Sequence, residues 1–479
     1  MLPTAAPARV LSRFDATCIV IGAIIGSGIF FNPSRIASLV DTGNLALLAW
    51  ALGGFIAMCG ALVFAELGRR YNSSGAQYDI LRDSYGPLPA FLFVFCNATG
   101  TQACAIGIIA VLCTQNLAAA AGFATPQGWQ LMGVASLLIA LLATANIIGV
   151  RWGSRIQNFT VMCKIATLLA ITALAAFAAP DNAAAIAAQP HDGKLSPFAG
   201  VLAGLVSASF AYGGWQQALW ISGEVRDPRR NLPWAIILGV SIVIVVYLLA
   251  NWAYLHLLGV HGVAETEVLA ADAVATVYPT YGRRAVAAAV GISTFGVLNS
   301  QLLSGPRLIY GMARDGRFFR VFGRLSPYFG TPVACILLLA IPAIALLFIA
   351  GDKRMDYLLT GAVFIDTVFF ALTGAALFIV RRKFKAADSA GEPGFRVPLY
   401  PLIPILFILG QIAGMIGTFV DEDVRAASYI GVAWILAGFL LYLIKFRRRD
   451  PAAPPPAVTA SPTPSSSSLP RSPLPPASP

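Results

Sequence analysis

The chain has 479 residues, of which 57% are hydrophobic and 11% charged, and its mean hydropathy is +0.74. Soluble domains carry about 25% charged residues, so this composition excludes a soluble globular enzyme and predicts a protein that crosses a membrane many times. The net charge of +11 could indicate a nucleic-acid partner. The basic residues instead follow the loops between apolar segments, so we expect no nucleic acid to bind.

Apolar segments of membrane-spanning length recur along the whole chain. About 20 apolar residues cross a bilayer, and the sequence has room for twelve such segments. No cleavable signal precedes the first, so residues 1–14 are expected to form a short cytoplasmic N-terminus. We expect transmembrane helices at residues 15–39, 45–67, 88–117, 129–148, 156–179, 198–222, 233–257, 285–312, 332–350, 356–380, 400–420 and 426–445.

The first span is interrupted by small residues. Its centre reads IGAIIGSGIFF, with Gly22, Gly26, Ser27 and Gly28 where a plain lipid anchor would carry Leu or Ile. Glycine weakens a helix, and unwound backbone at bilayer depth persists only where it lines a cavity. We therefore expect this span to unwind at its centre and to form half of a binding site, although glycine also serves to pack membrane helices closely.

The sixth span carries a second interruption. It reads SFAYGGWQQALW, with Gly213 and Gly214 between Tyr212 and Trp215. Two glycine-broken spans in different parts of one chain are typical of the midplane site of a secondary transporter. The GAIIGSG stretch is neither a dinucleotide fingerprint nor a phosphate loop, because no strand precedes it and no lysine follows.

The basic residues divide unevenly between the two sides of the expected membrane. When the loops are sorted into two alternating sets, one set holds 24 Lys and Arg and the other holds 6. The positive-inside rule places the basic set in the cytoplasm. Both termini are therefore expected there, in a multi-pass protein of the plasma membrane, and the high Arg and Ala content suits a bacterial inner membrane. The sparse set consists of Lys194, Arg283, Arg284, Lys353, Arg354 and Arg425.

The first ten spans divide into two groups of five. Because five is odd, the second group must be inverted relative to the first, which places the two broken spans antiparallel across one site. We expect a first five-helix repeat at residues 15–180, a second at 198–380 and two additional helices at 399–446. Residues 447–479 are rich in proline and serine and are expected to form a disordered cytoplasmic tail.

Five longer motifs follow one another along the chain. They are GAIIGSGIF in span one, FAELGRRYNSSGAQYDILRDSYGPLPAFL after span two, SFAYGGWQ followed by GEVRDPRRNLP at span six, STFGVLNSQLLSGPRLIYGMARDG at span eight, and FRVPLYPLIP before span eleven. In this order they resemble the amino acid-polyamine-organocation (APC) transporters, and among them the L-type amino acid transporter group. The chain departs from the family pattern at Gln216, where Asn is frequent, and at Thr367, where an aromatic residue is frequent.

This resemblance implies an all-α membrane protein with twelve transmembrane helices, a LeuT-like 5+5 inverted repeat and discontinuous helices 1 and 6. It implies a permease that moves L-amino acids, neutral ones in the first place, by alternating access without sodium, as an exchanger or as a proton symporter. The alternatives are a transporter of cationic amino acids or polyamines, and a non-transporting amino-acid sensor on the same scaffold. We expect no enzymatic activity, because no nucleophile, acid pair or metal cluster lies in a watery position.

The expected partners are the amino acid, the lipid bilayer and, for a symporter, protons. The seven cysteines lie in expected spans without a CxxC pair, so they read as packing residues. We expect no cofactor, no metal and no disulfide-linked heavy subunit, and the oligomeric state is left open.

A zwitterionic amino acid brings a carboxylate and an ammonium that need partners when they leave water. Backbone N–H groups at a restarted helix suit the carboxylate, and free carbonyls at the end of a half-helix suit the ammonium. The resemblance assigns the same positions and makes Phe210 an aromatic gate over the substrate. The expected substrate-binding residues are Ile24, Ile25, Gly26, Ser27, Gly28, Phe210, Ala211, Gly213 and Gly214.

Two ionisable residues lie deep inside expected spans and are functional candidates for that reason. Lys164 resembles the span-five lysine of sodium-independent relatives, which stands where sodium-coupled relatives hold an ion. It could tie the backbone of span one to Ser293 or Thr294, either as a proton carrier or as a permanently charged tether. Asp366 could contact a polar or cationic substrate tail, gate the outer side, or hydrogen-bond a neighbouring helix.

Overall fold

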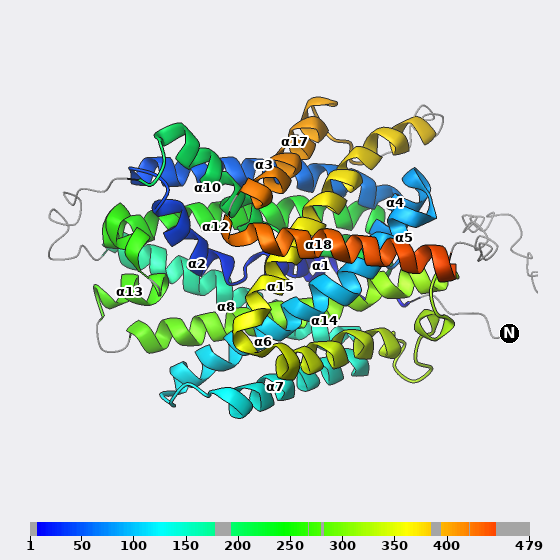
Figure 1. The fold of residues 1–479 in the computed structure, drawn as a ribbon, viewed down its shortest axis with the longest axis horizontal. Helices are drawn as coiled ribbons and strands as arrows, with labels where there is room; N and C mark the ends of the chain where they lie inside the picture. The colour runs from blue at the N-terminus through cyan, green and yellow to red at the C-terminus, as the bar shows by residue number, and fades with distance from the viewer. Residues whose placement is uncertain are drawn as a thin grey trace, which may run out of the picture.

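The computed structural model describes residues 7–177, 193–266, 268–278, 282–384, 394–420 and 422–446. In this part of the chain every regular element is a helix, and the only β-type pairing is an isolated bridge between Leu11 and Val225. The helices form one bundle in which most long helices run along its longest axis (Figure 1). The expected all-α class is confirmed, whereas the tail expected at 447–479 lies outside the described residues.

The bounds of the helices follow the apolar segments of the sequence. In chain order they are α1 (Arg13–Ile24), α2 (Gly28–Ala37), α3 (Gly43–Arg70), α4 (Ala76–Tyr85), α5 (Pro87–Cys96), the π-helix η1 (Asn97–Thr101), α6 (Gln102–Ala121), α7 (Gly128–Ile148), α8 (Val150–Phe177), α10 (Pro197–Ala211), α11 (Gln217–Trp220), the 3-10 helix η2 (Ser222–Glu224), α12 (Pro228–Glu265), α13 (Leu269–Ala275), α14 (Gly282–Arg314), the 3-10 helix η3 (Arg320–Gly323), α15 (Val333–Lys383), α17 (Leu402–Val420), α18 (Glu422–Leu441) and the π-helix η4 (Tyr442–Phe446).

Among the described residues, nine helical segments are long and apolar enough to cross a membrane, and there are ten if α1 and α2 count as one span bent by 42°. Two further apolar helices, Pro197–Ser209 and Val333–Ile349, are shorter. The second of these belongs to α15, which runs continuously across the residues expected as spans nine and ten. The structure thus has many apolar spans, and the count of twelve stays a prediction.

Small residues let the inner helices approach closely. A Cβ atom added to Gly53 of α3 would lie 2.7 Å from the Cβ of Ala208 in α10, and one added to Gly239 of α12 would lie 2.6 Å from the side chain of Val20 in α1. Membrane helices associate largely through such close packing, because lipid is as apolar as a leucine side chain. The packing of α1, α3, α10 and α12 therefore holds both interrupted helices inside the bundle.

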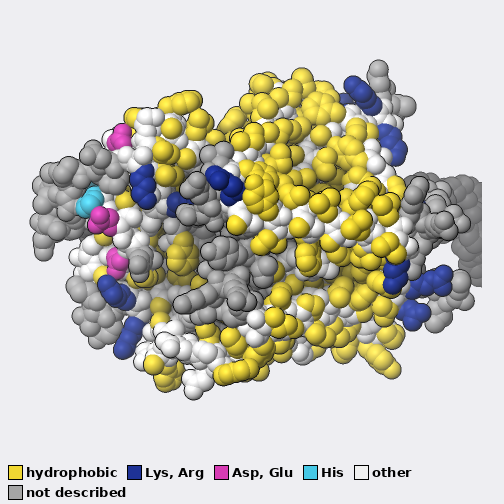
Figure 2. All heavy atoms as spheres, viewed as in Figure 1, with side chains coloured by type: hydrophobic (Ala, Val, Ile, Leu, Met, Phe, Trp, Pro, Cys, Tyr) yellow, Lys and Arg dark blue, Asp and Glu magenta, His cyan; other side chains and the backbone are white. Residues whose placement is uncertain are grey.

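The two ends of the bundle differ in charge. In Figure 2 hydrophobic side chains cover most of the middle, the right-hand end shows Lys and Arg, and the opposite end also shows Asp, Glu and His. The right-hand end holds helix α4 (Figure 1). It also holds the ion pairs of Arg70 and Arg381 with Glu66 and of Arg82 with Asp315. We call it the arginine-rich end.

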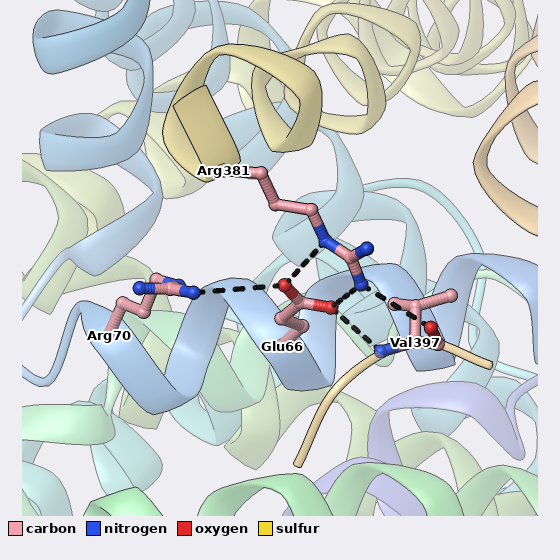
Figure 3. Close-up of polar contacts among 4 residues, drawn as sticks. All are labelled: Glu66, Arg70, Arg381 and Val397. Carbon is pink, nitrogen blue, oxygen red and sulfur yellow. Dashed lines mark hydrogen bonds and ion pairs between the residues drawn. The ribbon is translucent and has the colours of Figure 1, made fainter. Parts of the chain in front are cut away.

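A buried carboxylate joins three segments at the arginine-rich end. Glu66 of α3 is fully buried and accepts hydrogen bonds from the Nε and Nη2 atoms of Arg381 in α15, at 2.9 and 2.6 Å. It also accepts one from the backbone N–H of Val397 at 2.7 Å, while Arg70 lies 4.0 Å away (Figure 3). Because the carboxylate is bonded on both oxygens, its burial is compensated. Glu66 thus ties α3 to α15 and to the segment that precedes α17.

Candidate functional site

A cavity of about 280 Å³ lies where the two interrupted helices meet. Its wall combines the residues around both interruptions with side chains from α6, α14, α15 and α17. Small-molecule pockets have volumes of roughly 300–1,000 Å³, so this cavity suits a small ligand. Its polar wall residues are Ser27, Thr101, Gln102, Ser209, Gln216, Gln217, Thr294, Gln301, Asp366, Thr367, Gln411 and Thr418.

The first interruption leaves backbone donors at the cavity wall. Helix α1 ends at Ile24, the backbone of Ile25 is extended (φ −70°, ψ 91°), and α2 starts again at Gly28. The N-cap residue Ser27 makes no side-chain capping bond. The first N–H groups of a helix have no partner within the helix and carry the positive end of its dipole. Since Gly26, Ser27 and Gly28 line the cavity, this wall can hold an anionic group such as a carboxylate.

The second interruption lies directly against the first. Helix α10 ends at Ala211, and Gly214 adopts a positive φ of 125°. A Cβ atom at Gly214 would lie 2.5 Å from the carbonyl oxygen of Ala23, so a larger residue has neither the space nor the backbone conformation. The side-chain oxygen of Gln216 accepts a hydrogen bond from the N–H of Gly214 at 3.0 Å. The glycine and its amide partner thus hold the unwound segment against α1.

A tyrosine from a third helix joins the two interruptions. The hydroxyl of Tyr247 in α12 donates to the carbonyl of Ile24 at 3.0 Å and lies 3.5 Å from the carbonyl of Ala211. Its ring packs against Trp50 and Tyr212, at centroid distances of 5.7 and 5.1 Å. The last carbonyls of α1 and α10 are therefore oriented by one buried hydroxyl. Nothing in the apolar sequence around Tyr247 indicates this role.

The side chain of Lys164 in α8 contacts the backbone of the first interruption. Only 2% of its surface is exposed, and its ammonium donates to the carbonyls of Gly22 at 3.0 Å and Ile25 at 2.7 Å. The hydroxyl of Ser293 in α14 donates to the same Ile25 carbonyl at 3.4 Å. Lys164, Ile25 and Ser293 thereby link α8, α1 and α14. Thr294 is not part of this link, because its hydroxyl bonds within α14.

A buried hydrogen-bond network lies between the cavity and the arginine-rich end. The side-chain oxygen of Gln217 in α11 accepts bonds from Ser300 at 2.8 Å and Ser304 at 2.6 Å, and its amide nitrogen donates to Gln301 at 2.8 Å. The neighbouring Trp220 donates to Gln77 of α4 at 2.8 Å. This network connects α11 to α14 and α4 and closes this side of the cavity.

A second set of buried contacts joins η2 to α14. Arg307 of α14 and Glu224 of η2 form an ion pair at 3.0 Å, with side chains only 1% and 2% exposed. The backbone of the residue after Glu224, Val225, pairs with Leu11 near the N-terminus in a parallel bridge. Arg307 follows Ser304 by three residues in α14, so this ion pair lies next to the Gln217 network.

The structure brings most of the predicted site residues together. Nine of them line the cavity: Ile24, Gly26, Ser27, Gly28, Ala211, Gly213, Gly214, Thr294 and Asp366. Three further predicted residues meet behind the first interruption and do not line the cavity, namely Ile25, Lys164 and Ser293. The side chain of Phe210 lies outside the described part of the structure, so its gating role stays a prediction.

Sequence reasoning missed the contribution of the third span. The π-helix η1 separates α5 from α6 and places Thr101 and Gln102 in the cavity wall. Single π turns inside α-helices are frequent at functional sites. The polar run NATGTQ inside an apolar span is the sequence signal that could have indicated it.

Two interrupted helices around one small cavity, within a bundle of membrane-length helices, are the features of a secondary transporter. Residues 11–444 match the family model described as amino acid permease. The chain belongs to this family.

Relatives with known activities cover most of the chain. It is 30% identical over 452 residues to the b(0,+)-type amino acid transporter 1 of Mus musculus, covering 92% of this chain and 89% of that protein. It is 28% identical over 431 residues to the serine/threonine exchanger SteT of Bacillus subtilis (strain 168), covering 89% and 94%. It is 29% identical over 448 residues to the large neutral amino acids transporter small subunit 2 of Homo sapiens, covering 90% and 79%.

These findings confirm the resemblance to APC permeases of the L-type group. The protein is a multi-pass membrane protein that transports amino acids, and it is not an enzyme.

Proposed function

We propose that this protein exchanges L-amino acids across the plasma membrane, a bacterial inner membrane, by alternating access and without sodium. The proposed fold is the twelve-span LeuT-like 5+5 inverted repeat with discontinuous helices 1 and 6, and both termini lie in the cytoplasm. The two interruptions at one cavity support this arrangement. The charge of the arginine-rich end supports its cytoplasmic position.

The substrate backbone fits between the two interruptions. Its carboxylate meets the unpaired N–H groups at the start of α2, around Ser27 and Gly28. Its ammonium meets the carbonyls at the end of α1 and α10, which Tyr247 orients. Burying both charges of a zwitterion is favourable only when each has such partners.

The position of Lys164 carries the proposal of sodium independence. A free cation at the end of α1 would need the carbonyls of Gly22 and Ile25, and the Lys164 ammonium already occupies both. Two carbonyl acceptors favour the charged amine, whereas its burial opposes the charge, so Lys164 can serve as the cation at this position. The similarity to a serine/threonine exchanger supports exchange over proton symport.

Alternating access requires the arginine-rich end to open. The Gln217 network and the Arg307–Glu224 pair separate the cavity from that end. These contacts would break when the cavity faces the cytoplasm. Both involve α14 on one side and the segment from α11 to η2 on the other, so the second half of the interrupted helix is the part that would move.

We also propose that no disulfide-linked heavy subunit is needed. All seven cysteines are unpaired, six are buried, and Cys163 alone is partly exposed. Cys163 lies within α8 rather than in a loop, a position that a soluble partner domain cannot reach.

Uptake of labelled amino acids into proteoliposomes tests this function. We expect equal rates with sodium or choline outside and faster uptake when unlabelled amino acid is inside. Lys164→Ala should lower the rate at least about tenfold, because each charge-assisted hydrogen bond contributes about 1.5–3 kcal/mol. Lys194→Ala, at an exposed lysine, is the matched control and should leave the rate unchanged. Sodium dependence, or a normal rate in Lys164→Ala, would contradict the proposal.

A further inference from the structure

Among the described residues that line the cavity, Asp366 is the only charged one. The 28 residues that line the cavity include no Lys, Arg or His. The described part of the structure shows no ion pair to Asp366, and the side-chain amide of Asn97 in η1 lies within hydrogen-bonding reach of its carboxylate. One neutral amide does not balance a carboxylate at this depth.

Buried carboxylates elsewhere in the bundle have cationic partners. Glu66 is paired with Arg381 at 2.6 Å, and Glu224 with Arg307 at 3.0 Å. Asp366, a partly buried carboxylate, differs from these two acids because no cation pairs with it among the described residues. A cationic ligand in the cavity would supply such a partner.

Two buried acceptors line the same cavity as this carboxylate. Thr101 is 8% exposed and Gln102 is 3% exposed, and both line the cavity. The hydroxyl oxygen of Thr101 and the amide oxygen of Gln102 have no hydrogen-bond partner among the described residues. Buried polar atoms are nearly always bonded in folded proteins, so two orphans in one wall indicate a ligand with hydrogen-bond donors.

The π-helix places these groups together. η1 packs against α15, which carries Asp366, and it directly precedes Gln102. Asn97, at the start of η1, approaches the carboxylate, and Thr101, at its end, reaches the cavity. Asn97, Thr101 and Gln102 thus come from one short stretch, and its π-helical part packs against the helix that carries Asp366.

We propose that Asp366 pairs with the ammonium or guanidinium at the end of a cationic amino acid's side chain, with Thr101 and Gln102 as additional acceptors. This inference rests on the proposed function, because it assumes that the substrate backbone is bound at the two interruptions. It identifies lysine, ornithine and arginine as the preferred class of substrate.

Matched pairs of amino acids test the inference on the full-length protein. Arginine and citrulline have nearly the same shape, as do lysine and norleucine, and only one member of each pair is cationic. In proteoliposomes we expect the cationic member to compete for uptake about tenfold better or more, the value of one charge-assisted hydrogen bond. Binding to the detergent-purified protein, measured by calorimetry, should show the same ratio.

Asp366→Asn keeps the shape of the side chain and removes its charge. We expect the ratio between cationic and neutral members to fall toward one, while binding of norleucine stays within about twofold of the unmodified protein. Glu265→Gln removes an exposed acidic side chain, 72% exposed, far from the cavity wall, and should leave the ratio unchanged.

The outcomes separate this inference from the proposed function. Equal binding of arginine and citrulline by the unmodified protein would overturn the inference. An Asp366→Asn variant that loses both members of a pair equally would also overturn it, because the carboxylate would then serve the fold or the substrate backbone. Binding with the expected ratio but without any uptake would leave the inference standing and overturn the proposed transport cycle.

Discussion

Two regions of this bundle differ in whether their polar side chains have bonding partners. At the arginine-rich end and between it and the cavity, the buried carboxylates of Glu66 and Glu224 each meet a guanidinium from another helix. In the cavity, the part of the chain that the structure describes offers no cation to Asp366 and no donor to two other acceptors of the wall, Thr101 and Gln102. An unpaired buried charge costs several kcal/mol, so the stability of the fold alone accounts for the ion pairs of the first region. The unpaired polar groups of the cavity are accounted for when a ligand bonds to them.

The difference indicates which substitutions should act on stability and which on transport. Removing one partner at the arginine-rich end leaves a charge buried without compensation. Altering the cavity wall leaves the fold intact and changes what the cavity binds.

Gly28→Leu should have the largest effect on transport. A Cβ atom at this position already lies 3.2 Å from the Cβ of Ala211, so a leucine side chain would fill the wall where the substrate carboxylate is proposed to bind. We expect uptake to fall to background with normal membrane insertion. Gly133→Leu in α7 is the control, because no atom lies within 4 Å of the added Cβ. Unchanged substrate binding in Gly28→Leu would refute the carboxylate site.

Glu224→Gln should have the largest effect on stability. The variant leaves Arg307 charged and buried, which costs about 3–5 kcal/mol. Thermal unfolding of the protein in detergent should show a clear drop in the transition temperature. The double variant Glu224→Gln/Arg307→Met should recover much of it, since no charge then remains buried. If Asp366→Asn destabilises the fold as strongly, the contrast between the two regions is wrong.

Asp79 of α4 offers a pH-dependent test at the arginine-rich end. Arg82 faces three carboxylates there, those of Asp79 and Asp315 at 3.0 Å and that of Asp83 at 2.9 Å. Burial raises the pKa of the Asp79 carboxyl to about 6, against the opposing effect of Arg82, and the two other carboxylates add to the rise.

Because the pKa of Asp79 is higher in the folded state than its ordinary value of 3.8, the folded state binds this proton more readily. Stability from this group should therefore increase as the pH falls through about 6, by at most about 1.4 kcal/mol per pH unit. Thermal unfolding at several pH values should show this rise in the native protein relative to Asp79→Asn. Parallel pH profiles for the two proteins would count against it.

Tyr247→Phe should have the smallest effect. The variant loses the hydroxyl that orients the carbonyls of Ile24 and Ala211. One hydrogen bond contributes about 1 kcal/mol, so we expect substrate binding to weaken about fivefold. Tyr254→Phe is a matched control from the same helix, because the buried Tyr254 hydroxyl has no partner. Equal losses in both variants would show that the ring environment, and not the hydroxyl, is responsible.

The interruptions of the helices could be predicted from the sequence because helix propensity is local. Gly26, Gly28, Gly213 and Gly214 lie within apolar segments and weaken them where they stand, and the structure breaks the helices at these places. The two deep charges, Lys164 and Asp366, could also be recognised from their apolar neighbours. The groups that each of these two residues contacts could not be predicted in this way.

The partners of these residues come from distant parts of the chain. Lys164 reaches a carbonyl 139 residues away, and Tyr247 one that is 223 residues away. No local pattern encodes such a distance, and a hydroxyl in an apolar helix looks the same in sequence whether it is bonded or not. Tyr247 and Tyr254 illustrate this, since in the described part of the chain only the first has a hydrogen-bond partner.

By itself, the sequence determined the membrane class, the two interruptions and the two charges within apolar segments, because hydropathy and glycine content act within a single span. The tertiary structure decided which polar groups are satisfied. It paired Glu66 with Arg381 across 315 positions and, among the described residues, left Thr101 and Gln102 without partners in the cavity wall. That division depends on the packing of helices from both halves of the chain, and packing is settled only when the whole bundle is assembled.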